Sequence, residues 1–155
     1  MLEKIIIIYN KITNKRRMFG MGLLREAQQE DAIGRMIINV LGEHYTRYAC
    51  IHETKAVEAI LKCIIKLRGG ECLETYSMEG LYSQYREINQ VDVSAWRDVI
   101  LAMTTAKVKA EDSGWHPTID TFRKLELAYT ELLQVIDVDV EYGGTLVLPE
   151  KLDSF

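Results

Sequence analysis

The segment that most constrains the fold of this chain is residues 54–68, which read TKAVEAILKCIIKLR. Its few polar residues are three or four positions apart, so a helix gathers them into one narrow stripe. These residues are Lys55, Glu58, Lys62 and Lys66. A helix whose remaining surface is apolar packs against other elements on most sides, and Gly69-Gly70 supplies a stop after it. The sequence therefore predicts a central, mostly buried helix.

Length and composition indicate one ordinary globular domain, residues 1–155. Hydrophobic residues make up 48% of the chain and charged residues 27%, which is typical of a soluble protein. No apolar run approaches the ~20 residues that a helix needs to cross a bilayer. The odd number of cysteines favours free thiols in a reducing compartment; they are Cys50, Cys63 and Cys72. We expect a cytoplasmic protein that does not bind membranes.

Four further helices are predicted from apolar residues at helical spacing and from capping residues. They cover about residues 23–44, 77–89, 94–113 and 117–136. Ser77 can cap the second of these, and Pro117 opens the last. The inward stripe expected in the first is Ile33, Met36, Ile37, Val40 and Leu41.

Three regions have the pattern of strands. They are residues 4–9 with a return over 17–19, residues 46–52, and residues 136–142 with a return over 145–148. The first holds four consecutive isoleucines, the other two alternate, and Gly143-Gly144 is a hairpin turn signal. The predicted fold is α+β and mainly helical, with about five helices and a small, mainly antiparallel sheet. That sheet would combine an N-terminal strand or hairpin with a C-terminal β-hairpin.

The glycines before the first long helix form a candidate phosphate site. Gly20 and Gly22 would precede a helix N-terminus, whose free N–H groups attract anions. Basic residues lie close by in sequence: Lys15, Arg16, Arg17 and Arg25. The alternative is a plain strand-to-helix turn, because neither a third glycine nor a Gly-Lys-Ser/Thr motif follows. The same basic segment is the candidate contact for nucleic acid.

Two groups of carboxylates are candidate ligands for a divalent metal. Glu26 and Glu30 project to the apolar side of the first long helix, and carboxylates there need a partner or a metal. The other group alternates along the predicted C-terminal strand and consists of Asp137, Asp139 and Glu141. In each case the alternative is an exposed acidic surface without a metal. The cysteines and histidines show no zinc-ligand spacing.

Charge is distributed unevenly along the chain. Residues 1–25 carry six Lys and Arg against one acid, whereas residues 111–155 carry ten Asp and Glu against three Lys and Arg. The two ends can pair within the fold, pair between subunits, or contact different partners. Trp115, in a predicted loop, is a candidate anchor for a protein partner.

Residues 8–15, IYNKITNK, resemble the first strand and turn of GIY-YIG nucleases, although Ile7 stands where that family has its first glycine. An arginine early in the next helix and a glutamate in a later one also follow in a similar order. The resemblance implies phosphodiester cleavage with Tyr9, Arg25 and Glu58 as catalytic residues and Glu58 as the ligand of Mg²⁺ or Mn²⁺.

A second resemblance is to all-α nucleotide pyrophosphohydrolases of the MazG kind. The matching residues are Glu26, Glu30, Glu58 and Asp98. The resemblance implies clustered helix carboxylates that bind magnesium.

Because no complete catalytic constellation is present, we interpret the chain as a small cytosolic protein-interaction or regulatory protein, inhibitor-like, without a cofactor. It would act through a homo-oligomeric or partner interface, and a virus or mobile element would be a fitting source. The alternative is a metal-dependent phosphoesterase that acts on nucleic acid or on nucleotides and uses Mg²⁺ or Mn²⁺. A third interpretation is a nucleic-acid binder without catalysis.

Overall fold

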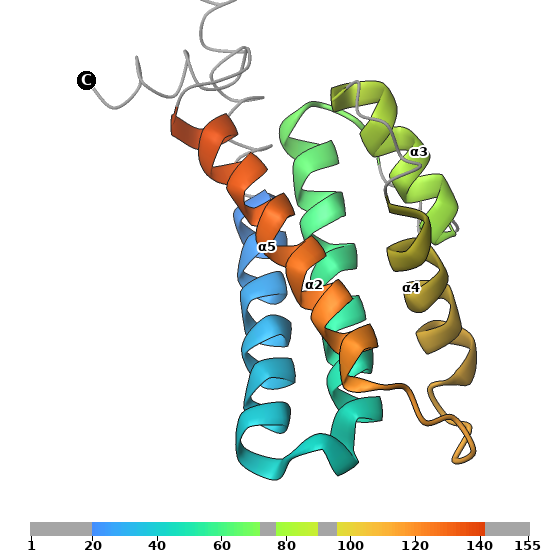
Figure 1. The fold of residues 1–155 in the computed structure, drawn as a ribbon. Coiled ribbons are helices and arrows are strands. Elements are labelled where there is room, and N and C mark those ends of the chain that lie inside the picture. Colours follow the sequence, from blue (N-terminus) through green and yellow to red (C-terminus); the bar gives the residue numbers. More distant parts are fainter. Residues whose placement is uncertain (1–19, 72–76, 90–95, 142–155) are drawn as a thin grey trace, which may run out of the picture.

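The computed structural model describes residues 20–71, 77–89 and 96–141, and every regular element in these ranges is helical. A first helix covers residues 20–36 and is followed by η1 (Ile37–Leu41) and η2 (Glu43–Tyr45). The remaining elements are α2 (Thr46–Leu67), α3 (Met78–Asn89), α4 (Arg97–Lys109) and α5 (Ile119–Glu141). Figure 1 shows the first helix and the α3–α4 pair on opposite sides of α2, with α5 crossing α2. None of these helices is long and apolar enough to span a bilayer.

The predicted α+β class is wrong for this part of the chain. Residues 46–52 belong to α2, and residues 136–141 are the last turns of α5. In both places the residues that alternate like a strand also fit the spacing of a helix. Ala49 and Cys50 continue the buried face of α2, and Ile136 continues that of α5. The proposed strands at residues 4–9, 17–19 and 145–148 lie outside the described residues.

The central helix is confirmed and is longer than predicted. Thirteen of the 22 residues of α2 are buried, and α2 contacts η1, η2, α3, α4 and α5. Its end also follows the prediction, since Gly69 has a positive φ of 84° and Gly70 N–H donates to Ile65 O at 2.8 Å. The helices predicted to follow it are found as α3, α4 and α5. Ser77 Oγ accepts a hydrogen bond from Gly80 N at 3.1 Å, as expected of the cap.

Gly20 and Gly22 lie inside the first helix, so the predicted glycine turn is wrong. Close helix packing explains Gly20, because a Cβ added there would lie 2.8 Å from Leu67 Cδ2. Cys63 Sγ donates to Gly20 O across the same contact at 3.2 Å. Gly34 also allows close packing nearer the C-terminal end of the first helix, since a Cβ added there would lie 2.8 Å from Glu53 Oε2. These two glycines let the first helix approach α2 closely.

The first helix ends in a π-helical turn that changes which side chains face the core. Gly42 N donates to Ile37 O at 3.1 Å, the five-residue spacing of a π-helix. Ile37 and Ile38 are buried, whereas Val40 and Leu41 are 74% and 55% exposed. Three and four residues after Ile37, an α-helix would have turned both side chains inward. The predicted inward stripe is therefore wrong for Val40 and Leu41, and it is also wrong for Met36, which directly precedes the turn and is 53% exposed.

Candidate functional site

Gly20 and Gly22, the glycines of the predicted phosphate site, are helical in the structure and do not form a turn before the helix. Gly20 is buried in the contact with α2, and Gly22 is exposed on a helix that already includes both residues. Their N–H groups therefore do not form the predicted glycine loop. Arg25 is exposed on the same helix. The other residues assigned to phosphate binding or catalysis lie outside the described ranges: Tyr9, Lys15, Arg16 and Arg17.

The predicted metal ligands of the helices are separated from one another. Glu26 is exposed, Glu30 Oε2 lies 2.6 Å from His52 Nδ1, and Glu58 Oε1 pairs with Lys62 Nζ at 3.2 Å and Lys107 Nζ at 3.1 Å. Among the side chains that the structure describes, no group of three or more from His, Cys, Asp and Glu could hold a metal ion.

The acidic row proposed for the C-terminal strand also changes. Asp137, Asp139 and Glu141 belong to the last turns of α5, so their backbone is helical. Residues two apart share a face on a strand but not on a helix. The strand geometry on which that metal site depended is therefore absent from these residues.

Sequence reasoning missed a buried carboxyl, that of Glu53 on α2. Glu53 has 0% exposure, and neither side-chain oxygen has a hydrogen-bond partner in the described structure. Burial, and next the Asp31 carboxyl, raise the pKa of Glu53 from 4.5 to about 10. If the predicted helix had been extended towards the N-terminus from residue 54, helical spacing from Ala49, Ala56 and Ile60 would have placed Glu53 on its buried face.

Charged side chains from two other helices lie next to Glu53. On the first helix, Arg35 Nε is 2.8 Å from Asp31 Oδ1. Arg35 also reaches α5, where its NH1 is 3.2 Å from Glu126 Oε2. The other oxygen of Glu126 is 2.9 Å from NH1 of Arg123. The two guanidinium groups are thus already paired with two other carboxylates. Glu53 is the carboxyl of this group that has no ion pair with a described residue.

A second feature missed from the sequence is a patch of exposed apolar side chains, which we call the apolar tip. Its members, with exposed fractions of 45–74%, are Met36, Val40, Leu41, Tyr45 and Tyr48. The rings of Tyr45 and Tyr48 are 6.4 Å apart between centroids. These residues extend from Met36, the last residue of the first helix, through the π turn and the connection to Tyr48 in the first turn of α2. No sequence signal marked the tip, because the π turn departs from the helical period on which the prediction relied.

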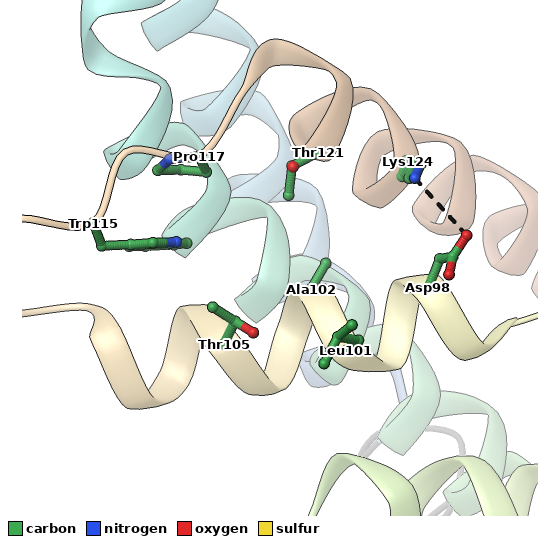
Figure 2. A pocket seen from close by; sticks show the side chains of 8 residues that line it. All are labelled: Asp98, Leu101, Ala102, Thr105, Trp115, Pro117, Thr121 and Lys124. Carbon is green, nitrogen blue, oxygen red and sulfur yellow. Dashed lines mark ion pairs between the residues drawn. The ribbon is translucent and has the colours of Figure 1, made fainter.

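A pocket of about 270 Å³ lies between α4 and α5, beside the loop that joins them (Figure 2). We call it the Trp115 pocket; it is lined by Asp98, Leu101, Ala102, Thr105, Trp115, Pro117, Thr121 and Lys124. Asp98 and Lys124 form an ion pair at 3.8 Å. Asp112 O links the loop to the tip, since it accepts from Trp115 N at 3.1 Å and from Arg47 NH1 at 3.0 Å. The tip and the loop therefore belong to one end of the bundle.

Comparison of the chain with protein-family models, with curated proteins and with solved structures finds no match. Residues 46–52, which lie between Arg25 and Glu58 of the GIY-YIG resemblance, are helical here because they belong to α2. Three carboxylates of the MazG resemblance have different partners, since Asp98 pairs with Lys124, Glu30 with His52 and Glu58 with Lys107. The function is therefore argued from the structure alone.

Proposed function

We propose that this chain is a small regulatory interaction protein of the cytosol that associates with a second copy of itself through the apolar tip. The observation that supports the proposal is the 45–74% exposure of five large apolar side chains within residues 36–48. Large apolar side chains that are exposed together in one part of a molecule are typical of interaction sites. A partner that removes it from water gains about 25 cal/mol for each Å² covered. The proposal requires no cofactor.

Charge at the tip favours a second copy as the partner. Glu43 is exposed, and Arg47 follows it one turn later on the same end of the molecule. In a two-fold dimer the same patch faces itself, so an acid and a base on one patch can pair across the axis. The guanidinium of Arg47 lies 4.8 Å from the centroid of the Tyr48 ring. Arginine and tyrosine are both enriched in protein interfaces.

The phosphoesterase alternative has less support from the described residues. The carboxylates proposed for it are exposed or are paired with His52, Lys62 and Lys107, so they are spread over the molecule. A divalent metal requires several oxygen ligands within about 2.0–2.6 Å of one point. We therefore put forward the interaction function alone.

Sedimentation velocity tests the proposal, with Leu41→Ser as the tip variant and Leu127→Ser as its control. The two leucines are a close match, because Leu41 is 55% exposed at the tip and Leu127 is 58% exposed on α5. We expect the wild-type mass to rise with concentration towards that of a dimer. Leu41→Ser should weaken dimerisation by about tenfold or more, since a residue central to an interface contributes more than about 1 kcal/mol.

Leu127→Ser should dimerise as the wild type does, and both variants should keep the wild-type melting temperature because the substituted side chains are exposed. A wild-type protein that stays monomeric at every concentration would refute the proposal. Dimerisation of Leu41→Ser that is as strong as that of the wild type would show that the dimer forms through another surface.

A further inference from the structure

The carboxyl of Glu53 is in a position where its charge has little compensation, because the nearby Arg35 guanidinium, which favours that charge, is itself paired with Asp31 and Glu126. Glu53 has 0% exposure, and both oxygens lack a hydrogen-bond partner among the described residues. A buried carboxylate in that state costs several kcal/mol, and such a group normally takes up a proton instead. The Glu53 side chain has little room to move, since a Cβ added at Gly34 would contact Glu53 Oε2, Ala49 O and the ring of Phe122.

The charges around Glu53 balance only when Glu53 is neutral. Asp31 and Arg35 face it from the first helix, Glu126 faces it from α5, and Cys50 lies one turn away on α2. Arg35 is paired with Asp31 and Glu126, and Glu126 is paired also with Arg123. Two carboxylates therefore meet two guanidinium groups. Ionisation of Glu53 would add a negative charge to this group and bring it next to two others.

A protonated Glu53 can form a hydrogen bond between helices, whereas an ionised Glu53 would destabilise their packing. Its O–H can donate to the Asp31 carboxylate, which gives one of its oxygens the partner that is missing from the ionised form. That hydrogen bond would join α2 to the first helix next to the ion pairs by which Arg35 joins the first helix to α5.

We infer that the protonated Glu53 carboxyl is a latch that holds the first helix on α2 and α5, and that loss of its proton releases the first helix. Release requires movement because Gly34 packs against the carboxyl, so water reaches an ionised Glu53 only when the first helix moves away. None of the residues that form the latch belongs to the apolar tip, so the measurements of the latch and of the dimer can fail separately.

The sign of the pH dependence follows from the two states. Glu53 binds its proton more tightly in the closed bundle, where its pKa is about 10, than when hydrated, where it is 4.5. The stabilising contribution is fully present below pH 4.5 and is lost progressively up to about pH 10. One linked proton makes opening more favourable by about tenfold per pH unit within that window.

Two measurements on the full chain test the latch. The first is NMR of protein labelled with ¹³C at the glutamate carboxyls, in which the Glu53 signal is assigned as the one that is missing from Glu53→Gln. In the wild-type protein at pH 7, the chemical shift of this signal should be that of a neutral carboxylic acid. Hydrogen exchange, corrected for its intrinsic pH dependence, should show residues 20–41 losing protection by about tenfold per pH unit between pH 6 and 9. In Glu53→Gln the same residues should keep constant protection over that range.

Glu58→Gln is the matched control, because Glu58 lies on the same helix but is paired with Lys62 and Lys107. It should retain the wild-type pH dependence. A Glu53 signal that titrates like that of an ordinary glutamate, or first-helix protection in the wild type that does not change with pH, would overturn the inference. The hydrogen-exchange measurement uses the wild-type protein alone, so it tests the inference even where a variant folds poorly.

Discussion

Two glycines of the first helix should respond in opposite ways to substitution by alanine. Gly22 is exposed, and a Cβ there would meet no atom within 4 Å. Gly34 is buried, and its Cβ would lie 2.8 Å from Glu53 Oε2, 3.3 Å from Ala49 O and 3.4 Å from Phe122 Cε2. The same chemical change is thus made once in open space and once inside the contact with α2.

The magnitudes follow from two opposing effects. Alanine is favoured over glycine in a helix by about 0.5–1 kcal/mol, which is the whole expected gain at Gly22. At Gly34 the added methyl overpacks the contact, which costs about 1–3 kcal/mol. Ala49 O belongs to the backbone of α2 and cannot rotate away, so we expect a net loss of about 1–2 kcal/mol. The melting temperature should rise by roughly 1–4 °C for Gly22→Ala and fall by roughly 2–8 °C for Gly34→Ala.

Urea unfolding followed by circular dichroism at fixed pH measures both changes. The double variant Glu53→Ala/Gly34→Ala locates the clash. Because Glu53→Ala removes the atom nearest to the added Cβ, Gly34→Ala should destabilise the Glu53→Ala protein much less than the wild type. Gly34→Ala that stabilises the protein as much as Gly22→Ala would refute the close packing on which this reasoning depends. A loss at Gly34 that is the same with and without Glu53 would assign the clash to the backbone of α2 alone.

Three more predictions follow from burial and pairing. Phe122→Ala should lower the free energy of unfolding by about 3–5 kcal/mol in the same urea experiment, because Phe122 has 0% exposure and its loss leaves a cavity. The Cys50 thiol, whose pKa burial raises to about 12, should resist an aromatic disulfide reagent in the native protein and react in urea; fast native reaction would contradict its burial. Glu58→Ala should lower stability by no more than about 1 kcal/mol, since its lysine partners are partly exposed, and a larger loss would assign Glu58 a role in the core.

The helices that the sequence predicted well are those whose apolar period and caps agree. Ser77 and the spacing of Leu81 and Tyr85 identify α3, and both of these apolar side chains are buried. The period of α2 was equally clear from Val57 onward. Its first two turns were mistaken for a strand because residues 46–52 satisfy alternation and helical spacing together. The small Ala49 and Cys50, which allow close packing, also blur the pattern.

The remaining errors have a common physical origin in contacts between helices. The sequence predicts Gly20 in a turn before the helix, although the first helix needs this glycine, and Gly34 as well, to approach α2. Local sequence does not reveal such a contact, because the atoms that exclude a Cβ belong to residues such as Leu67 and Glu53. The same limit applies to Glu53, whose neighbours Asp31 and Glu126 are brought to it by the packing of three helices.

The π turn at Ile37–Leu41 also has a consequence at the level of the gene. A π turn amounts to one extra residue within an α-helix. An in-frame deletion of one codon between Ile37 and Val40 would remove that extra residue, restore the α-helical register and place Leu41 three residues after Ile37, on the side on which Ile37 is buried. One codon therefore separates a version of this chain that exposes Leu41 at the tip from a version that turns the same side chain towards its core.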